Sequence, residues 1–115
     1  MIIAYSGNTI TWNKNSEQRI IISLTYDIVC FAINENYIAV IEDWQYLEGE
    51  ENLYIYNTMG KLLFKVKEAP NAFSGKGYYT SVGFKSDYIL GAHTFDYKYE
   101  IDLRTNEFIN ETYTK

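Results

Sequence analysis

The side chains best suited to chemistry in this 115-residue sequence are acidic and aromatic, and they gather in one short segment. Residues 42–51 hold five carboxylates and no lysine or arginine, which equals the net charge of −5 of the whole chain. Acidic groups steer a cationic partner towards a surface, and large aromatic side chains are enriched at the centres of protein interfaces. The segment therefore predicts a binding loop for a cationic protein, made by Glu42, Asp43, Trp44, Tyr46, Glu48, Glu50 and Glu51. The alternative is an acidic loop that is merely solvated.

Candidates for catalysis are few. His93 is the only histidine, so any triad or Cys–His chemistry would have to use it, and no serine lies in a Gly-x-Ser-x-Gly turn. The acidic loop lacks the spacing of a calcium-binding EF-hand, and residues 74–77 lack the upstream glycine of a phosphate-binding loop. We expect no enzyme activity, no metal site and no cofactor.

Composition narrows the class of partner and the compartment. Direct nucleic-acid binding requires clustered lysine and arginine, which the sequence does not show. No apolar run approaches the roughly 20 residues of a membrane helix, and residues 1–4 do not resemble a signal peptide. The single cysteine, Cys30, is expected to be a buried small side chain. These features predict a cytoplasmic protein that contacts neither membrane nor nucleic acid.

Alternation of apolar and polar residues predicts about ten strands and no long helix. Asn, Asp, Ser and Gly between the strands suit tight hairpin turns. The expected hairpins pair residues 9–12 with 19–24, 29–33 with 37–41, 53–56 with 61–66, 79–84 with 88–92, and 97–102 with 107–111.

The sequence also repeats itself between residues 29 and 109. Phe31 matches Phe84, Tyr37-Ile38 matches Tyr88-Ile89, Asn57 matches Asp102, and Trp12-Asn13 is similar to Tyr56-Asn57. A period near ~50 residues made of strands and turns is typical of β-propeller blades. We therefore expect one all-β domain over residues 1–115, a partial (half) propeller of about two and a half four-stranded antiparallel blades. Its parts are a hairpin in 1–25 and blades in 26–68 and 78–113. A sandwich of five to seven strands is the structural alternative.

Blade connectivity places particular loops together. The loops after the second strand of each blade, residues 42–51 and 93–96, should share one side with the link 67–78. His93, Phe95, Asp96 and Tyr97 are therefore added to the expected partner-binding surface. Alternatively, Trp44 and Phe95 fold back and pack on their own loops.

A small, acidic, tyrosine-rich β chain of a few propeller-like blades resembles a known group of proteins. It is similar to immunity proteins of bacterial contact-dependent growth inhibition, a polymorphic toxin system, of the kind that neutralises EndoU-type ribonuclease toxins. The resemblance implies that the chain binds a cognate toxin nuclease, one that cleaves tRNA, and covers its cationic active-site cleft as a monomer in a 1:1 complex. The chain is not expected to be the nuclease, because an EndoU site uses two histidines and a lysine and His93 stands alone. The alternative is a propeller fragment that dimerises as a scaffold or a carbohydrate-binding module.

Overall fold

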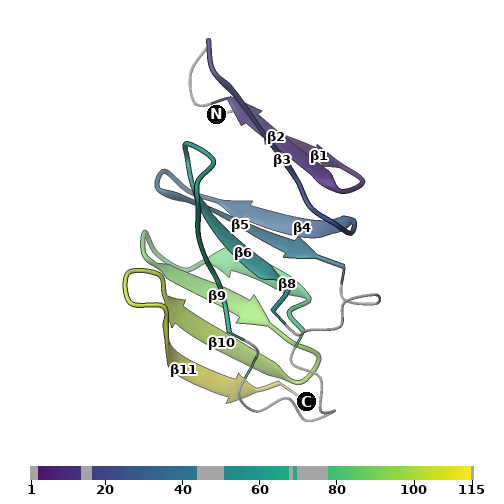
Figure 1. Cartoon of the computed structure of the whole chain (residues 1–115). Coiled ribbons are helices and arrows are strands. Elements are labelled where there is room, and N and C mark those ends of the chain that lie inside the picture. Colours follow the sequence, from purple (N-terminus) through teal and green to yellow (C-terminus); the bar gives the residue numbers. More distant parts are fainter. Residues whose placement is uncertain (1–2, 14–16, 44–50, 68, 70–77, 115) are drawn as a thin grey trace.

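The chain is all-β, with three antiparallel sheets that follow one another along the sequence (Figure 1). The computed structural model describes residues 3–13, 17–43, 51–67, 69 and 78–114, and within these ranges it contains eleven strands and no helix. The first sheet has the order β1-β2-β3, the second β4-β5-β6-β7 and the third β8-β9-β10-β11. Each sheet is thus a meander of strands that are neighbours in sequence.

The strand bounds follow the alternating apolar positions. The first sheet contains β1 (Ile3–Ser6), β2 (Thr9–Asn13) and β3 (Arg19–Ser23). The second contains β4 (Ile28–Ile33), β5 (Tyr37–Glu42), β6 (Leu53–Asn57) and β7 (Leu62–Lys65). The third contains β8 (Ser81–Phe84), β9 (Ile89–His93), β10 (Tyr97–Asp102) and β11 (Glu107–Tyr113).

The ten strands expected from the sequence are all present, and the prediction of an all-β chain is confirmed. Residues 53–56 pair on both edges within their own repeat, with β5 and with β7. The expected hairpin of residues 9–12 with 19–24 is present as β2 and β3, and β1 adds a third strand that the sequence did not predict. Ile3 and Tyr5 lie opposite Trp12 and Ile10 in the β1–β2 ladder, so this short strand widens the face of the sheet that carries Ile10 and Trp12.

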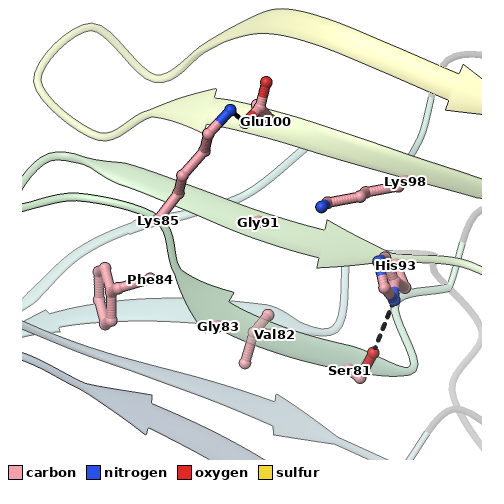
Figure 2. Close-up of a pocket in the computed structure, with 9 residues that line it drawn as sticks. All are labelled: Ser81, Val82, Gly83, Phe84, Lys85, Gly91, His93, Lys98 and Glu100. Carbon is pink, nitrogen blue, oxygen red and sulfur yellow. Dashed lines mark hydrogen bonds and ion pairs between the residues drawn. The ribbon is translucent and has the colours of Figure 1, made fainter.

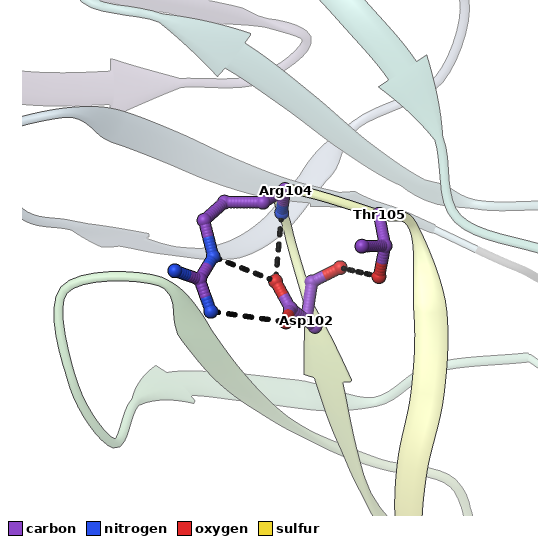
Figure 3. A network of polar contacts seen from close by, with 3 residues as sticks. All are labelled: Asp102, Arg104 and Thr105. Carbon is purple, nitrogen blue, oxygen red and sulfur yellow. Dashed lines mark hydrogen bonds and ion pairs between the residues drawn. The ribbon is translucent and has the colours of Figure 1, made fainter.

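Turns at one end of the sheets are fixed by side chains that hydrogen-bond the backbone. Between β10 and β11, the Asp102 carboxylate accepts from the backbone N–H of Arg104 at 2.9 Å and from its guanidinium at 3.2 and 3.3 Å (Figure 3). These bonds hold the pKa of Asp102 below its ordinary value. Asn106 closes the turn with a positive φ of 57°, a conformation that asparagine tolerates.

The second sheet lies between the other two, and both of its faces are covered. Ile38 and Val40 pack against Ile10 and Trp12 of the first sheet. The alternate residues of the second sheet pack on the third sheet, in a cluster that includes Ala39, Ile41, Leu53 and Ile55 from the second sheet and Leu90, Ala92, Tyr99 and Ile101 from the third. Strand β5 is therefore buried along nearly its whole length.

The registers correct one detail of the sequence repeat. Tyr37 lies opposite Asn57, whereas Ile89 lies opposite Asp102. If Asn57 and Asp102 are equivalent, the counterpart of Tyr37 is Ile89 and not Tyr88. A shift of one residue exchanges the two faces of a strand.

With the corrected register, equivalent residues of the second and third sheets point the same way. The second sheet uses Ala39, Ile41, Leu53 and Ile55 to contact its neighbour, and the third sheet has Gly91, His93, Lys98 and Glu100 at these positions. Its outer face is thus polar where the second sheet is apolar.

The first sheet is oriented differently. Trp12 and Tyr56 occupy similar positions before their turns, yet both lie in the cluster between the first and second sheets. The Trp12 indole N–H also donates to the Thr58 carbonyl at 2.8 Å. Matched faces of these two sheets therefore meet each other, and the first sheet caps the second rather than repeating its orientation.

Candidate functional site

The described acidic residues of the predicted loop lie at one end of the second sheet. At this end β4 and β6 begin and β5 ends. The backbone N–H of Asp43 donates to the Asp27 carbonyl at 2.7 Å, which brings these two acidic residues together just beyond the β4–β5 ladder. Glu51 is exposed and lies just before β6 at the same end. Lys67, which follows β7, lies there too.

Asp27 and Asp43 border a small hollow of about 170 Å³ together with Thr25 and Tyr26. None of Thr25, Tyr26 and Asp27 was expected from the sequence. A signal was present, because extending the expected pairing of residues 29–33 with 37–41 by two positions places Asp27 near Asp43. The structure therefore enlarges the acidic surface by one exposed carboxylate.

Glu42 does not belong to this surface, and its expected exposure is wrong. Its side chain is only 1% exposed, because it continues the inward-facing series of Ile38 and Val40 along β5. One carboxylate oxygen accepts the Tyr26 backbone N–H at 2.8 Å, and the other accepts the Tyr54 hydroxyl at 2.6 Å. Burial and the neighbouring Glu42 raise the pKa of Tyr54. Paired in this way, a buried carboxylate is a structural group.

A buried asparagine joins the second and third sheets beneath the acidic end. The Asn52 side-chain amide donates to the carbonyls of Glu42 at 2.9 Å and Tyr79 at 3.0 Å, and its oxygen accepts the Tyr79 N–H at 2.9 Å. The three bonds satisfy backbone groups of Glu42, the last residue of β5, and of Tyr79, which precedes β8. The end of β5 is thereby held against the residues that lead into β8, and Ser81 of β8 pairs with His93 at the end of β9. The described residues that flank loops 42–51 and 93–96 and the link 67–78 therefore lie on one side of the sheets, as expected.

The third sheet contributes four expected residues with different environments. Phe95 is 44% exposed in the β9–β10 turn, and His93 is exposed at the end of β9. Asp96 is 6% exposed, and its carbonyl accepts from the backbone and the hydroxyl of Thr114, so its expected role as an exposed charge is wrong. Tyr97 is half-buried, with its ring centroid 5.9 Å from that of Tyr99 and 5.3 Å from that of Tyr113. Tyr97 is therefore mainly a packing residue.

Four expected partner-binding residues, Trp44, Tyr46, Glu48 and Glu50, lie outside the described residues. Their roles stay predictions. The flanking Asp43 and Glu51 fix where the segment that contains them leaves and rejoins the second sheet.

The described residues contain no cluster of three or more His, Cys, Asp or Glu that could hold a metal ion. Cys30 is half-buried, its thiol donates to the Thr80 carbonyl at 3.9 Å, and burial raises its pKa. The acidic end therefore presents negative charge at one edge of a packed stack of sheets.

Comparison with protein-family models finds no match, and comparison with curated proteins finds none either. In the described part of the chain, nothing forms a helix long and apolar enough to cross a membrane.

Proposed function

We propose that this chain is a cytoplasmic immunity protein that binds a cationic bacterial toxin nuclease in a 1:1 complex and covers its active-site cleft. The observation that carries the proposal is the acidic end. Asp27, Asp43 and Glu51 lie where a segment with further carboxylates and no lysine or arginine joins the second sheet. A nuclease that cleaves tRNA needs a cationic cleft to hold phosphates, and carboxylates on a rigid edge can occupy the phosphate positions.

We also propose that the fold is a partial propeller. Support comes from the second and third sheets, which have the same meander order and whose equivalent faces point the same way. Their first strands, β4 and β8, also contact each other, as neighbouring inner strands of propeller blades would. The first sheet then acts as a cap rather than a further blade.

The outer face of the third sheet supports a monomer over a ring-shaped homodimer. Closing a propeller buries apolar residues between successive blades. Gly91, His93, Lys98 and Glu100 stand where an apolar contact would be required. Sedimentation should therefore give a mass near the 13.5 kDa of one chain rather than twice that value.

An immunity gene is expected to lie directly downstream of its toxin gene, so the direct test uses the toxin domain that the proposal predicts to be encoded just upstream. Purified chain added in equimolar amount should abolish tRNA cleavage by that domain. The triple variant Asp27→Asn, Asp43→Asn and Glu51→Gln should protect tRNA less well, with the fold unchanged. The control triple Glu35→Gln, Asp87→Asn and Glu107→Gln changes the charge equally at the opposite end. Full cleavage in the presence of unmodified chain would refute the proposal.

A further inference from the structure

The outer face of the third sheet has a hollow that the proposed function does not use. It has a volume of about 380 Å³ and is lined by Ser81, Gly83, Lys85, Gly91, His93, Lys98 and Glu100, with Val82 and Phe84 at one side (Figure 2). This volume falls within the range of small-molecule sites, roughly 300–1,000 Å³. The hollow occupies the face on which the second sheet, at equivalent positions, packs its neighbour.

Two glycines directly opposite each other form its floor. Gly83 pairs with Gly91 in the β8–β9 ladder. A Cβ on Gly91 would lie 3.3 Å from the Gly83 carbonyl oxygen, so close packing explains why position 91 is a glycine. A Cβ on Gly83 would meet no atom within 4 Å. Glycine weakens a strand and often marks close approach of a ligand, so an unconstrained glycine at Gly83 suggests that this space is kept open.

The walls supply hydrogen-bond donors. The Lys98 side chain extends over the floor, with its Cε 3.9 Å from the position of a Cβ on Gly91. At one end the Ser81 hydroxyl lies 3.3 Å from His93 Nδ1. If Nδ1 accepts from that hydroxyl, Nε2 carries the proton and is a donor.

The acidic residue of the hollow is already neutralised. Lys85 forms an ion pair with Glu100, and the Asn110 amide donates to the same carboxylate at 2.9 Å. The charges of Lys85 and Glu100 cancel, which makes Lys98 the cation that faces the remaining space. A net positive hollow on a chain with net charge −5 favours an anion there.

We propose that this hollow binds a small organic anion whose carboxylate or phosphate group contacts Lys98 and His93, with Ser81 orienting the imidazole, and whose body lies over Gly83 and Gly91. The site is separate from the acidic end and does not depend on the immunity function. The two proposals can therefore fail independently: the chain can protect tRNA without binding an anion, and it can bind an anion without protecting tRNA.

Titration by NMR with two probes, inorganic phosphate and citrate, each at constant ionic strength, tests the site. The amide signals of Gly83 and Gly91 should shift saturably with at least one probe, and the tighter probe identifies the preferred anionic group. Lys98→Gln should weaken binding about tenfold or more, because it removes a charge-assisted hydrogen bond. Lys61→Gln, the same charge change in the β6–β7 turn, should leave the affinity unchanged.

Gly83→Val provides a variant that fills the hollow without touching its charges. The added side chain has open space, so the melting temperature should not fall, and binding of both probes should be lost. Gly83→Ala serves the same purpose if the valine variant does not fold. The proposal is overturned if neither probe produces saturable shifts at these glycines up to about 10 mM. It is equally overturned if Lys98→Gln and Lys61→Gln weaken binding to the same extent.

Discussion

Glu42 shows how a single residue can change role between sequence and structure. In the sequence it begins an acidic run, and in the structure it is a buried acceptor for Tyr26 and Tyr54. The burial state of a carboxylate at the last position of a strand depends on which face it occupies. The Tyr54 hydroxyl, 12 residues after Glu42, is the partner that makes burial tolerable, and no local pattern reveals that contact.

We predict that Tyr54→Phe lowers the free energy of unfolding by about 1.5–3 kcal/mol, the usual contribution of a hydrogen bond to a charged group. Urea unfolding measures this loss. Tyr88→Phe is the control, because Tyr88 is exposed. Equal stability of the two variants would mean that the Tyr54–Glu42 bond contributes little.

The same pair predicts a dependence on alkaline pH. The pKa of Tyr54 is raised in the folded chain, whereas in the unfolded chain a tyrosine ionises near pH ~10. The contribution of the neutral hydroxyl is therefore fully present below about pH 10 and is lost as the pH rises through the folded-state pKa. Urea midpoints at pH values of about 8 and 10.5 should fall less for Tyr54→Phe than for the unmodified chain. An identical fall would contradict this assignment.

At the scale of elements, two asparagines join the second and third sheets at opposite ends. Asn52 is fully buried and makes three bonds to backbone groups, whereas Asn34 donates to the Asp87 carbonyl at an exposed turn. Asn52→Ala leaves buried groups without partners and should cost about 2–4 kcal/mol. Asn34→Ala should cost about 1 kcal/mol. Hydrogen exchange at the Tyr79 amide should accelerate only in the Asn52 variant, and protection in both would refute the bridging role.

The same substitution, glycine to alanine, should have opposite effects on stability at Gly60 in a turn and at Gly83 in a strand. Gly60 has φ +88° in the β6–β7 turn, and a Cβ there would lie 2.5 Å from the Ile20 Cγ2 atom, whereas Gly83 has open space. Gly60→Ala should therefore lose about 2 kcal/mol or more, because it combines a left-handed backbone with a clash. Gly83→Ala should gain about 0.5–1 kcal/mol. Thermal unfolding compares them, and a stable Gly60→Ala variant would show that the contact between β3 and this turn is adjustable.

Strand positions could be predicted from the sequence because alternation and turn residues are local. The ten expected strands depended on patterns such as Asn34 to Asn36 between two apolar runs. Strand β1 was missed because it has only four residues, of which the first three are apolar, so it shows no alternation of apolar and polar side chains. The register of the repeat was misplaced by one residue because the loops before Tyr37 and Ile89 differ in length, and only cross-strand pairing reveals that.

For the site, the sequence identified the acidic end but not which of its members face solvent. Asp43 and Glu51 lie on that end as expected, whereas Glu42 and Asp96 are buried. Asp27 and the glycine-floored hollow depend on contacts between strands. Such contacts are set by packing of one sheet on another, which composition alone does not specify.

At the scale of the whole molecule, three stacked sheets give a body with different ends and faces. Side-chain bonds hold the turns at one end, whereas the other end is acidic at the second sheet. The outer face of the third sheet is polar and hollowed, and the first sheet caps the second. This arrangement separates the acidic end, proposed to bind a protein, from the hollow proposed to bind a small anion.

If the aromatic residues in the acidic segment act as anchors, removing them should change the dissociation rate, whereas removing the acidic charges should change the association rate. Trp44→Ala or Tyr46→Ala should weaken toxin binding by about 2–4 kcal/mol, mainly through faster dissociation. Melting temperature and dissociation rate are measured on the same variants. Lower stability with an unaltered dissociation rate would mean that these aromatics belong to the fold.

The most direct test of the central claim is the association rate, as a function of salt, between this chain and the toxin domain proposed as its partner. Between about 0.05 and 0.5 M NaCl the rate should fall tenfold or more, because screening shortens the reach of the acidic end. The triple variant at Asp27, Asp43 and Glu51 should associate more slowly and with a flatter salt dependence than the equally charged triple at Glu35, Asp87 and Glu107. Equal rates and equal salt dependence for the two triples would contradict the account.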